Sequence, residues 1–97
     1  MSASDWTHIV VGAGAAGCAL AARLSECPDF NVLLIEAGGK GRDPALSVPM
    51  MTAVLMTGKR HVGRYATGAE PGLGGRSIAL PRGRVLGGST AINGMVY

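Results

Sequence analysis

The stretch that decides the fold is Gly12-Ala13-Gly14-Ala15-Ala16-Gly17, a G-x-G-x-x-G pattern that directly follows the apolar run Ile9-Val10-Val11. A short apolar run that enters a glycine cluster predicts a buried parallel strand, here over residues 6–11. The small helix-forming residues that follow predict a helix over 14–25, which Pro28 cannot continue. A second apolar run predicts a strand over 31–36. The order β-α-β requires the two strands to be parallel.

Each glycine of the pattern has a physical role in a dinucleotide-binding loop. Gly12 permits the tight turn, Gly14 lets the backbone approach a pyrophosphate, and Gly17 lets the helix pack against the sheet. The pyrophosphate is expected at the positive N-terminus of the helix. Glu36, about 20 residues further on, would accept hydrogen bonds from the ribose hydroxyls and disfavour a 2′-phosphate. The pattern does not distinguish FAD from NAD, and a plain glycine turn would leave Glu36 unexplained.

Beyond residue 39 the expected elements are shorter. We expect a loop over 40–49 and then an apolar segment over 48–56, in which Met50, Met51, Val54 and Leu55 share one helical face and fill the core. A solvated basic loop over 59–64 and a short strand over 76–80 should follow. The last elements are a loop over 81–88 and a helix that begins near 89, with Ser89 or Thr90 as N-cap.

Composition narrows the class of protein. The 97 residues allow one small domain, and 47% hydrophobic residues exclude a disordered tail. The net charge of +3 suits an anionic ligand without requiring nucleic acid, and 4% aromatic residues leave a Gly/Arg-rich nucleic-acid binder without a stacking platform. Cys18 and Cys27 form neither a metal site nor a disulfide framework, so we interpret both as packing residues in a reducing compartment.

A membrane or export segment is not expected. The uncharged stretch 9–22 is shorter than the ~20 residues of a membrane helix. The lipoprotein-like box Ala15-Ala16-Gly17-Cys18 lacks a basic region before it. We therefore expect a cytoplasmic protein with no membrane partner.

A second motif lies at residues 82–97, Arg-Gly-Arg-Val-Leu-Gly-Gly-Ser-Thr-Ala-Ile-Asn-Gly-Met-Val-Tyr. It places two arginines, a Gly-Gly turn and two hydroxyls before a new helix, which is a second arrangement that favours phosphate. The plainer interpretation is a glycine-rich loop with surface arginines.

This motif resembles the N-terminal signature of the glucose–methanol–choline (GMC) oxidoreductases, and residues 9–17, 36–38, 64–71 and 75–79 resemble the same family in order and spacing. The resemblance implies a Rossmann-like α/β FAD-binding fold of the three-layer ββα type, of which residues 1–97 are the N-terminal part. The substrate domain and the catalytic C-terminal half lie outside the chain. The implied cofactor-binding residues are Gly12, Gly14, Ala15 and Ala16 at the pyrophosphate, Glu36 with Ala37 at the ribose, Arg84, Gly87, Gly88 and Thr90 at the diphosphate and ribityl side, and Asn93, Gly94, Met95 and Val96 at the isoalloxazine ring.

The resemblance also implies a chemistry, which is hydride transfer from a primary alcohol to N5 of FAD with a histidine as base. Some members attach FAD through a histidine just before the Asn. Ile92 occupies that position here, so non-covalent FAD is predicted. His8 and His61 do not match the catalytic position, so we expect no catalytic residue and no metal site in this chain. Many members carry Trp where this chain has Gly63, so the resemblance implies nothing about the loop at that position.

The expected partners are a small alcohol and the remainder of the polypeptide. Choline, aryl alcohols, sugars and pyridoxine-like alcohols all remain possible, as do oxidase and dehydrogenase. The alternative function is an NAD- or ADP-binding module without redox chemistry, which leaves residues 82–97 without a role.

Overall fold

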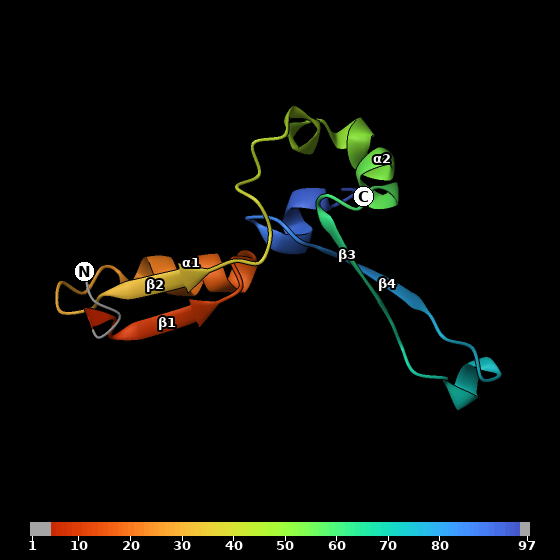
Figure 1. Cartoon of the computed structure of the whole chain (residues 1–97), viewed down its shortest axis with the longest axis horizontal. Coiled ribbons are helices and arrows are strands. Elements are labelled where there is room, and N and C mark those ends of the chain that lie inside the picture. The colour runs from red at the N-terminus through yellow and green to blue at the C-terminus, as the bar shows by residue number, and fades with distance from the viewer. Residues whose placement is uncertain (1–4, 96–97) are drawn as a thin grey trace.

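The computed structural model describes residues 5–95. It is elongated, with principal extents of 51 × 35 × 26 Å. Its radius of gyration of 16.8 Å exceeds the about 13 Å of a compact domain of this length. Figure 1 shows the reason, because a β-α-β unit and a long hairpin extend in different directions from a central region of loops and short helices.

The β-α-β unit confirms the prediction made from the glycine pattern. Strands β1 (His8–Val11) and β2 (Val32–Ile35) are parallel neighbours, with His8 opposite Val32 and Val11 opposite Ile35. Helix α1 (Ala15–Leu24) packs on both strands. The described residues thus form a sheet and one covering helix layer of a Rossmann-like fold. Ala21 is the buried residue of α1, whereas Leu20 is 52% exposed.

Gly17 explains how closely α1 approaches the sheet. A Cβ atom added at Gly17 would overlap the carbonyl oxygen of Gly12. Only glycine therefore permits this approach, as the sequence pattern predicted.

The segment after β2 holds short helical turns. Two 3₁₀ turns, η2 (Pro44–Ser47) and η3 (Pro49–Met51), precede helix α2 (Thr52–Thr57). The expected loop over 40–49 therefore contains ordered turns. The expected apolar face is largely wrong, because Leu55 is buried while Met50 is 91% exposed. The backbone turns at Pro49 and starts α2 only at Thr52, so Met50 does not share a helical face with Leu55.

The antiparallel hairpin differs most from the sequence prediction. Strand β3 (Val62–Ala66) pairs with β4 (Ala79–Gly83), from Val62 opposite Gly83 to Ala66 opposite Ala79, and the 3₁₀ turn η4 (Pro71–Leu73) lies near its tip. The predicted basic loop over 59–64 was wrong from Val62 onward, and the strand predicted at 76–80 lies further along the chain. Pro81 is tolerated because each strand has one neighbour among the described residues.

The last element is a 3₁₀ helix, η5 (Gly88–Ile92), instead of the expected α-helix. It begins after Gly87, which adopts φ 98°, and no side chain caps it. The predicted N-cap, Ser89 or Thr90, was therefore wrong. The Ser89 hydroxyl instead accepts a hydrogen bond from the Gly83 backbone N–H at 3.0 Å. The left-handed turn at Gly87 leaves Ser89 inside the helix, where it contacts the end of β4.

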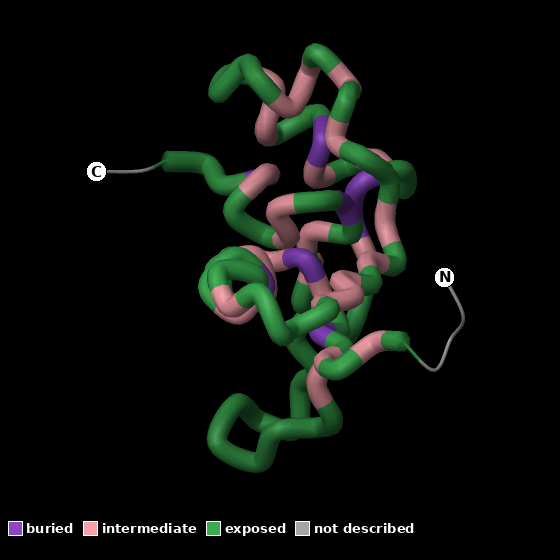
Figure 2. Tube along the Cα trace, turned by 90° about the vertical axis from the view of Figure 1, so that its left-hand side faces the viewer, coloured by how far each residue is buried: buried purple, intermediate pink, exposed green. Residues whose placement is uncertain are grey.

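The core is small and central. The buried residues come from three stretches, 10–21, 55–62 and 85–92, and Figure 2 shows them along the middle of the molecule while the hairpin tip is exposed. They are Val10, Ala13, Ala21, Leu55, His61, Val62, Val85 and Ile92. Large apolar side chains remain exposed, Val11 at 82% among them. Cys18 and Cys27 are half-buried free thiols.

Candidate cofactor-binding site

The first loop of the site is the turn from β1 into α1. Gly12 has φ 95° and donates its N–H to the Ile35 carbonyl at 2.7 Å. Gly14 is the N-cap of α1, and no side chain caps the helix. The N–H groups of the first turn, which includes Ala15 and Ala16, have no partner within the helix. A Cβ atom added at Gly14 would meet nothing within 4 Å. The loop thus presents free donors to open space, as a pyrophosphate requires.

Glu36 braces this loop from the end of β2. Its Oε2 accepts a hydrogen bond from the Ala13 N–H at 2.8 Å, and its Oε1 accepts one from the Gly38 N–H at 2.9 Å. The sequence analysis assigned this carboxylate to the ribose alone. A carboxylate offers about four acceptor positions, so ribose hydroxyls still have lone pairs available. Glu36 therefore has a structural task that the motif did not reveal.

The second motif folds back onto the first. Gly87 donates its N–H to the Ala13 carbonyl at 2.8 Å. Gly88 has φ 61°, and a Cβ atom added there would lie 2.9 Å from Cα of Gly14. The two glycine loops, from opposite ends of the chain, are thus in backbone contact. The Gly87–Gly88 turn therefore packs on the first glycine loop, while Arg82 and Arg84 are exposed.

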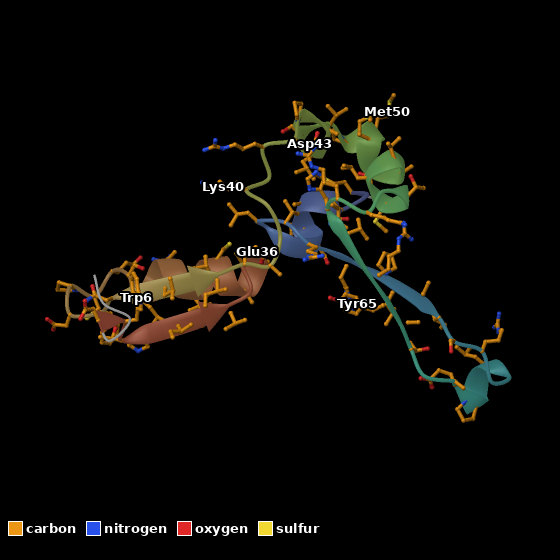
Figure 3. All side chains as sticks on the ribbon, viewed as in Figure 1. Trp6, Glu36, Lys40, Asp43, Met50 and Tyr65 are labelled. Atoms are coloured by element: carbon orange, nitrogen blue, oxygen red, sulfur yellow. The ribbon has the colours of Figure 1, made fainter. Side chains whose placement is uncertain are left out.

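A hollow of ≈ 340 Å³ lies where the two motifs meet, and four of the predicted residues line it: Gly12, Glu36, Ala37 and Arg84. Figure 3 shows Glu36 at the junction between the β-α-β unit and the rest of the chain. Arg84 supplies the cation of this hollow. Glu36, which can accept hydrogen bonds from hydroxyls, and Arg84, which can bind phosphate, therefore both line one space.

Five other residues line this hollow and were not predicted to bind the cofactor: Val11, Ile35, Gly83 and, from β3, Gly63 and Tyr65. Gly63 and Tyr65 are the two that β3 contributes. Their spacing of two along β3 places them on one face of the strand, which is the signal that could have found them. A Cβ atom added at Gly63 would lie 3.0 Å from Cε2 of Tyr65. The Tyr65 ring therefore lies over the position where many GMC members carry Trp.

Three predicted residues of the second motif lie around a different hollow, and Gly14, Ala15 and Ala16 line a further one beside β1 and α1. Thr90, Asn93 and Met95 line a space of ≈ 240 Å³ together with residues of α2 and the turns before it. The Thr52 hydroxyl donates to the Asn93 carbonyl at 3.3 Å, and Asn93 Oδ1 accepts from the Met95 N–H at 3.1 Å. These bonds engage one backbone group in each of two residues, Asn93 and Met95, that were assigned to the flavin ring. Gly94 is exposed, and Val96 lies outside the described residues.

Met95 has φ 49°, a left-handed conformation that non-glycine residues rarely adopt. Backbone strain of this kind often occurs at functional sites. The Asn93 side chain stabilises the turn by accepting the Met95 N–H.

Residues 5–95 contain neither a metal-binding cluster nor a membrane-spanning helix. No group of three or more His, Cys, Asp or Glu side chains is placed to hold a metal ion. None of the helices in that range is long and apolar enough to cross a membrane.

Fold and site together define a dinucleotide-binding α/β unit that has a second glycine motif against its first loop. A family model described as GMC oxidoreductase matches residues 6–97. The chain therefore belongs to the GMC oxidoreductase family.

Curated relatives agree with this assignment. The chain is 48% identical over 92 residues to an oxygen-dependent choline dehydrogenase of Vibrio vulnificus, covering 95% of this chain and 16% of the relative. It is 44% identical over 92 residues to an alcohol dehydrogenase [acceptor] of Pseudomonas putida, covering 95% and 17%. The chain thus spans about one sixth of the length of these relatives.

Solved structures agree as well. Pyridoxine 4-oxidase from Mesorbium loti superposes with a TM-score of 0.82 at 42% identity, over 95% of this chain and 18% of that one. A variant of Aspergillus oryzae formate oxidase, studied for FAD modification, superposes with a TM-score of 0.74 at 34% identity, over 94% and 17%.

Proposed function

We propose that this chain is the FAD-binding portion of a flavin-dependent alcohol oxidoreductase. The observation that supports this proposal most directly is the hollow in which Gly12, Glu36 and Ala37 of the first motif meet Arg84 of the second. An NAD- or ADP-binding module would need the first motif alone. Family membership and relatives named as choline and alcohol dehydrogenases support the redox function.

The residues present fit the cofactor. The uncapped start of α1 and the open space before Gly14 would hold the pyrophosphate. Glu36 would bind the ribose with its remaining lone pairs, and Arg84 would neutralise phosphate charge. Bound flavin would supply a hydride acceptor at N5 for a primary alcohol carbon. This chain's own residues bind and orient the cofactor, and we propose that the base and the substrate pocket lie in the remainder of the polypeptide.

Non-covalent attachment is part of the proposal. Ile92 stands where some GMC members carry the histidine that bonds to FAD. Its side chain is aliphatic and buried, 5% exposed, so it offers no nucleophile to the flavin.

The exposed apolar side chains of β1 would pack against the remainder of the polypeptide. Cytoplasmic location and the lack of nucleic-acid or membrane partners remain predictions.

The test is the visible absorption spectrum of the full-length protein before and after acid precipitation. A flavin band that moves to the supernatant supports FAD held without a covalent bond. Flavin that stays in the pellet contradicts the non-covalent part only. A protein without a flavin band, even after incubation with FAD, favours the nucleotide-binding module instead.

A further inference from the structure

A polar cluster of Asp43, Arg60 and His61 lies outside the hollow that Glu36 and Arg84 line, which is called the cofactor hollow below. His61 Nε2 is 2.9 Å from Asp43 Oδ2, and Arg60 Nη1 is 3.6 Å from the same oxygen. His61 is 7% exposed, although the sequence analysis placed it in a solvated loop. The hollow beside this cluster and the cofactor hollow have no lining residue in common. The proposed FAD site therefore leaves the buried His61 and the partly exposed Asp43 without a role.

The direction of the hydrogen bond follows from the two partners. The hydrogen bond from His61 lowers the pKa of the Asp43 carboxyl, and the Ala45 N–H and Arg60 add to this effect. The carboxylate can only accept, so His61 Nε2 carries the proton and donates. Nδ1 of His61 is buried without a hydrogen-bond partner.

One end of this pair is bonded to the start of η2, and the other end is bonded to the backbone of Arg84, which lines the cofactor hollow. Asp43 Oδ1 accepts the Ala45 N–H at 3.0 Å and thereby fixes the start of η2. The His61 carbonyl accepts the Arg84 N–H at 2.7 Å. The side chain of His61 therefore holds the segment that follows Ala37, while its backbone holds the segment that contains Arg84.

These two segments touch each other directly. The Leu86 N–H donates to the Gly39 carbonyl at 2.9 Å, and Gly39 forms a β-bridge with Val85, which is fully buried. A Cβ atom added at Gly38 would overlap the backbone of Arg84. A small shift of either segment would therefore change the distance between Ala37 and Arg84, which line the cofactor hollow.

We propose that the His61–Asp43 pair is a positioning device that sets FAD affinity by fixing the segments of Ala37 and Arg84 relative to each other, without contacting the cofactor. The proposal rests on the FAD-binding function proposed above. In Figure 3, Asp43 lies away from Glu36, beyond the loop that carries Lys40. His61 and Asp43 are therefore positioning residues and not catalytic ones.

The test compares two polar replacements of His61 in the full-length protein. His61→Gln places an amide N–H near the position of Nε2 and can still donate to Asp43. His61→Asn places its amide near Nδ1 and cannot reach Asp43. FAD affinity is measured by fluorescence titration of the deflavinated proteins, and the melting temperature of each apo-protein is measured by circular dichroism.

We expect His61→Asn to raise the Kd for FAD about 10-fold, as the loss of one charge-assisted hydrogen bond implies. His61→Gln should stay within about 3-fold of wild type. Asp43→Asn should weaken binding by a similar factor, and the double variant His61→Asn/Asp43→Asn should be no weaker than either single variant, since both remove one interaction. Arg60→Gln is the matched control, because Arg60 is 81% exposed at its side chain and should leave Kd unchanged.

Equal Kd values for wild type and His61→Asn would overturn the positioning role while leaving FAD binding intact. Equal losses in His61→Gln and His61→Asn would also overturn it, because the lost feature would then be ring packing and not the donated hydrogen bond. A wild-type protein that does not bind FAD would overturn the proposed function itself. The wild-type titration thus separates the two failures.

Discussion

Glu36→Gln tests whether the carboxylate at the end of β2 is a brace as well as a ligand. In the wild type its two oxygens accept the Ala13 and Gly38 N–H groups at 2.8 and 2.9 Å. The amide of Gln has nearly the same shape but only one acceptor oxygen. Its NH₂ group would face a backbone N–H, so one bond becomes a contact between two donors.

The expected magnitude follows from that one bond. A hydrogen bond to a charged group contributes about 1.5–3 kcal/mol, and Glu36 is half-buried, so we expect a loss of about 2 kcal/mol in the free energy of unfolding of the apo-protein. In the variant, part of the free energy of FAD binding must be used to restore the conformation of the loop between β1 and α1. The same free energy corresponds to a ~30-fold rise in the Kd for FAD.

Two measurements on the full-length protein check this expectation: urea unfolding of the deflavinated protein, and fluorescence titration with FAD. A carboxylate that serves only the ribose predicts a higher Kd with unchanged apo stability. That outcome would refute the role of Glu36 in stabilising the loop. A loss in both measurements supports it.

Three further predictions concern the loop and the second cluster. Gly17→Ala should destabilise the apo-protein by about 3 kcal/mol in chemical unfolding, because the new methyl group overlaps the Gly12 carbonyl, and an unchanged stability would contradict the close packing of α1. Gly14→Ala should cost the apo-protein only about 1 kcal/mol, since Ala is a poorer N-cap but its methyl group meets no protein atom, and it should raise the Kd for FAD about 10-fold; a retained affinity would mean that no phosphate approaches this position. Asp43 has a lowered pKa in the folded state, so its contribution to stability is present above its ordinary value of 3.8 and is lost as pH falls through the lower folded value. Unfolding at several acidic pH values should therefore show a steeper loss in wild type than in Asp43→Asn, and parallel curves would contradict the His61 contact.

The sequence predicted the β-α-β unit well because its signals are local. The apolar runs, the glycine spacing and Pro28 act within a few residues of the structure that they determine, and α1 begins within one residue of its predicted start. The contact between the two glycine motifs could be anticipated only through the family resemblance. Nothing local in the sequence indicates that Gly87 lies against Ala13.

The errors share one cause, which is that tertiary contacts override local signals. His61 lies among basic residues and was assigned to solvent, but its partner Asp43 lies in another segment. Pro81 indicated a loop, yet a strand with one neighbour tolerates it. Glu36 matched a ribose ligand, and its bonds to Ala13 and Gly38 depend on a loop conformation that no spacing rule specifies.

The backbone contact between the first and second glycine loops also has a consequence for biosynthesis. Contacts within β1, α1 and β2 are short in sequence and can form as soon as that stretch leaves the ribosome. Gly88 can reach Gly14 only after nearly the whole chain described here has been translated. Translation proceeds at about 5–20 residues per second, so several seconds pass between the synthesis of the first glycine loop and that of the second. The two glycine loops can therefore meet only late in the synthesis of this stretch, after residues 87–88 have folded back onto residues 13–14.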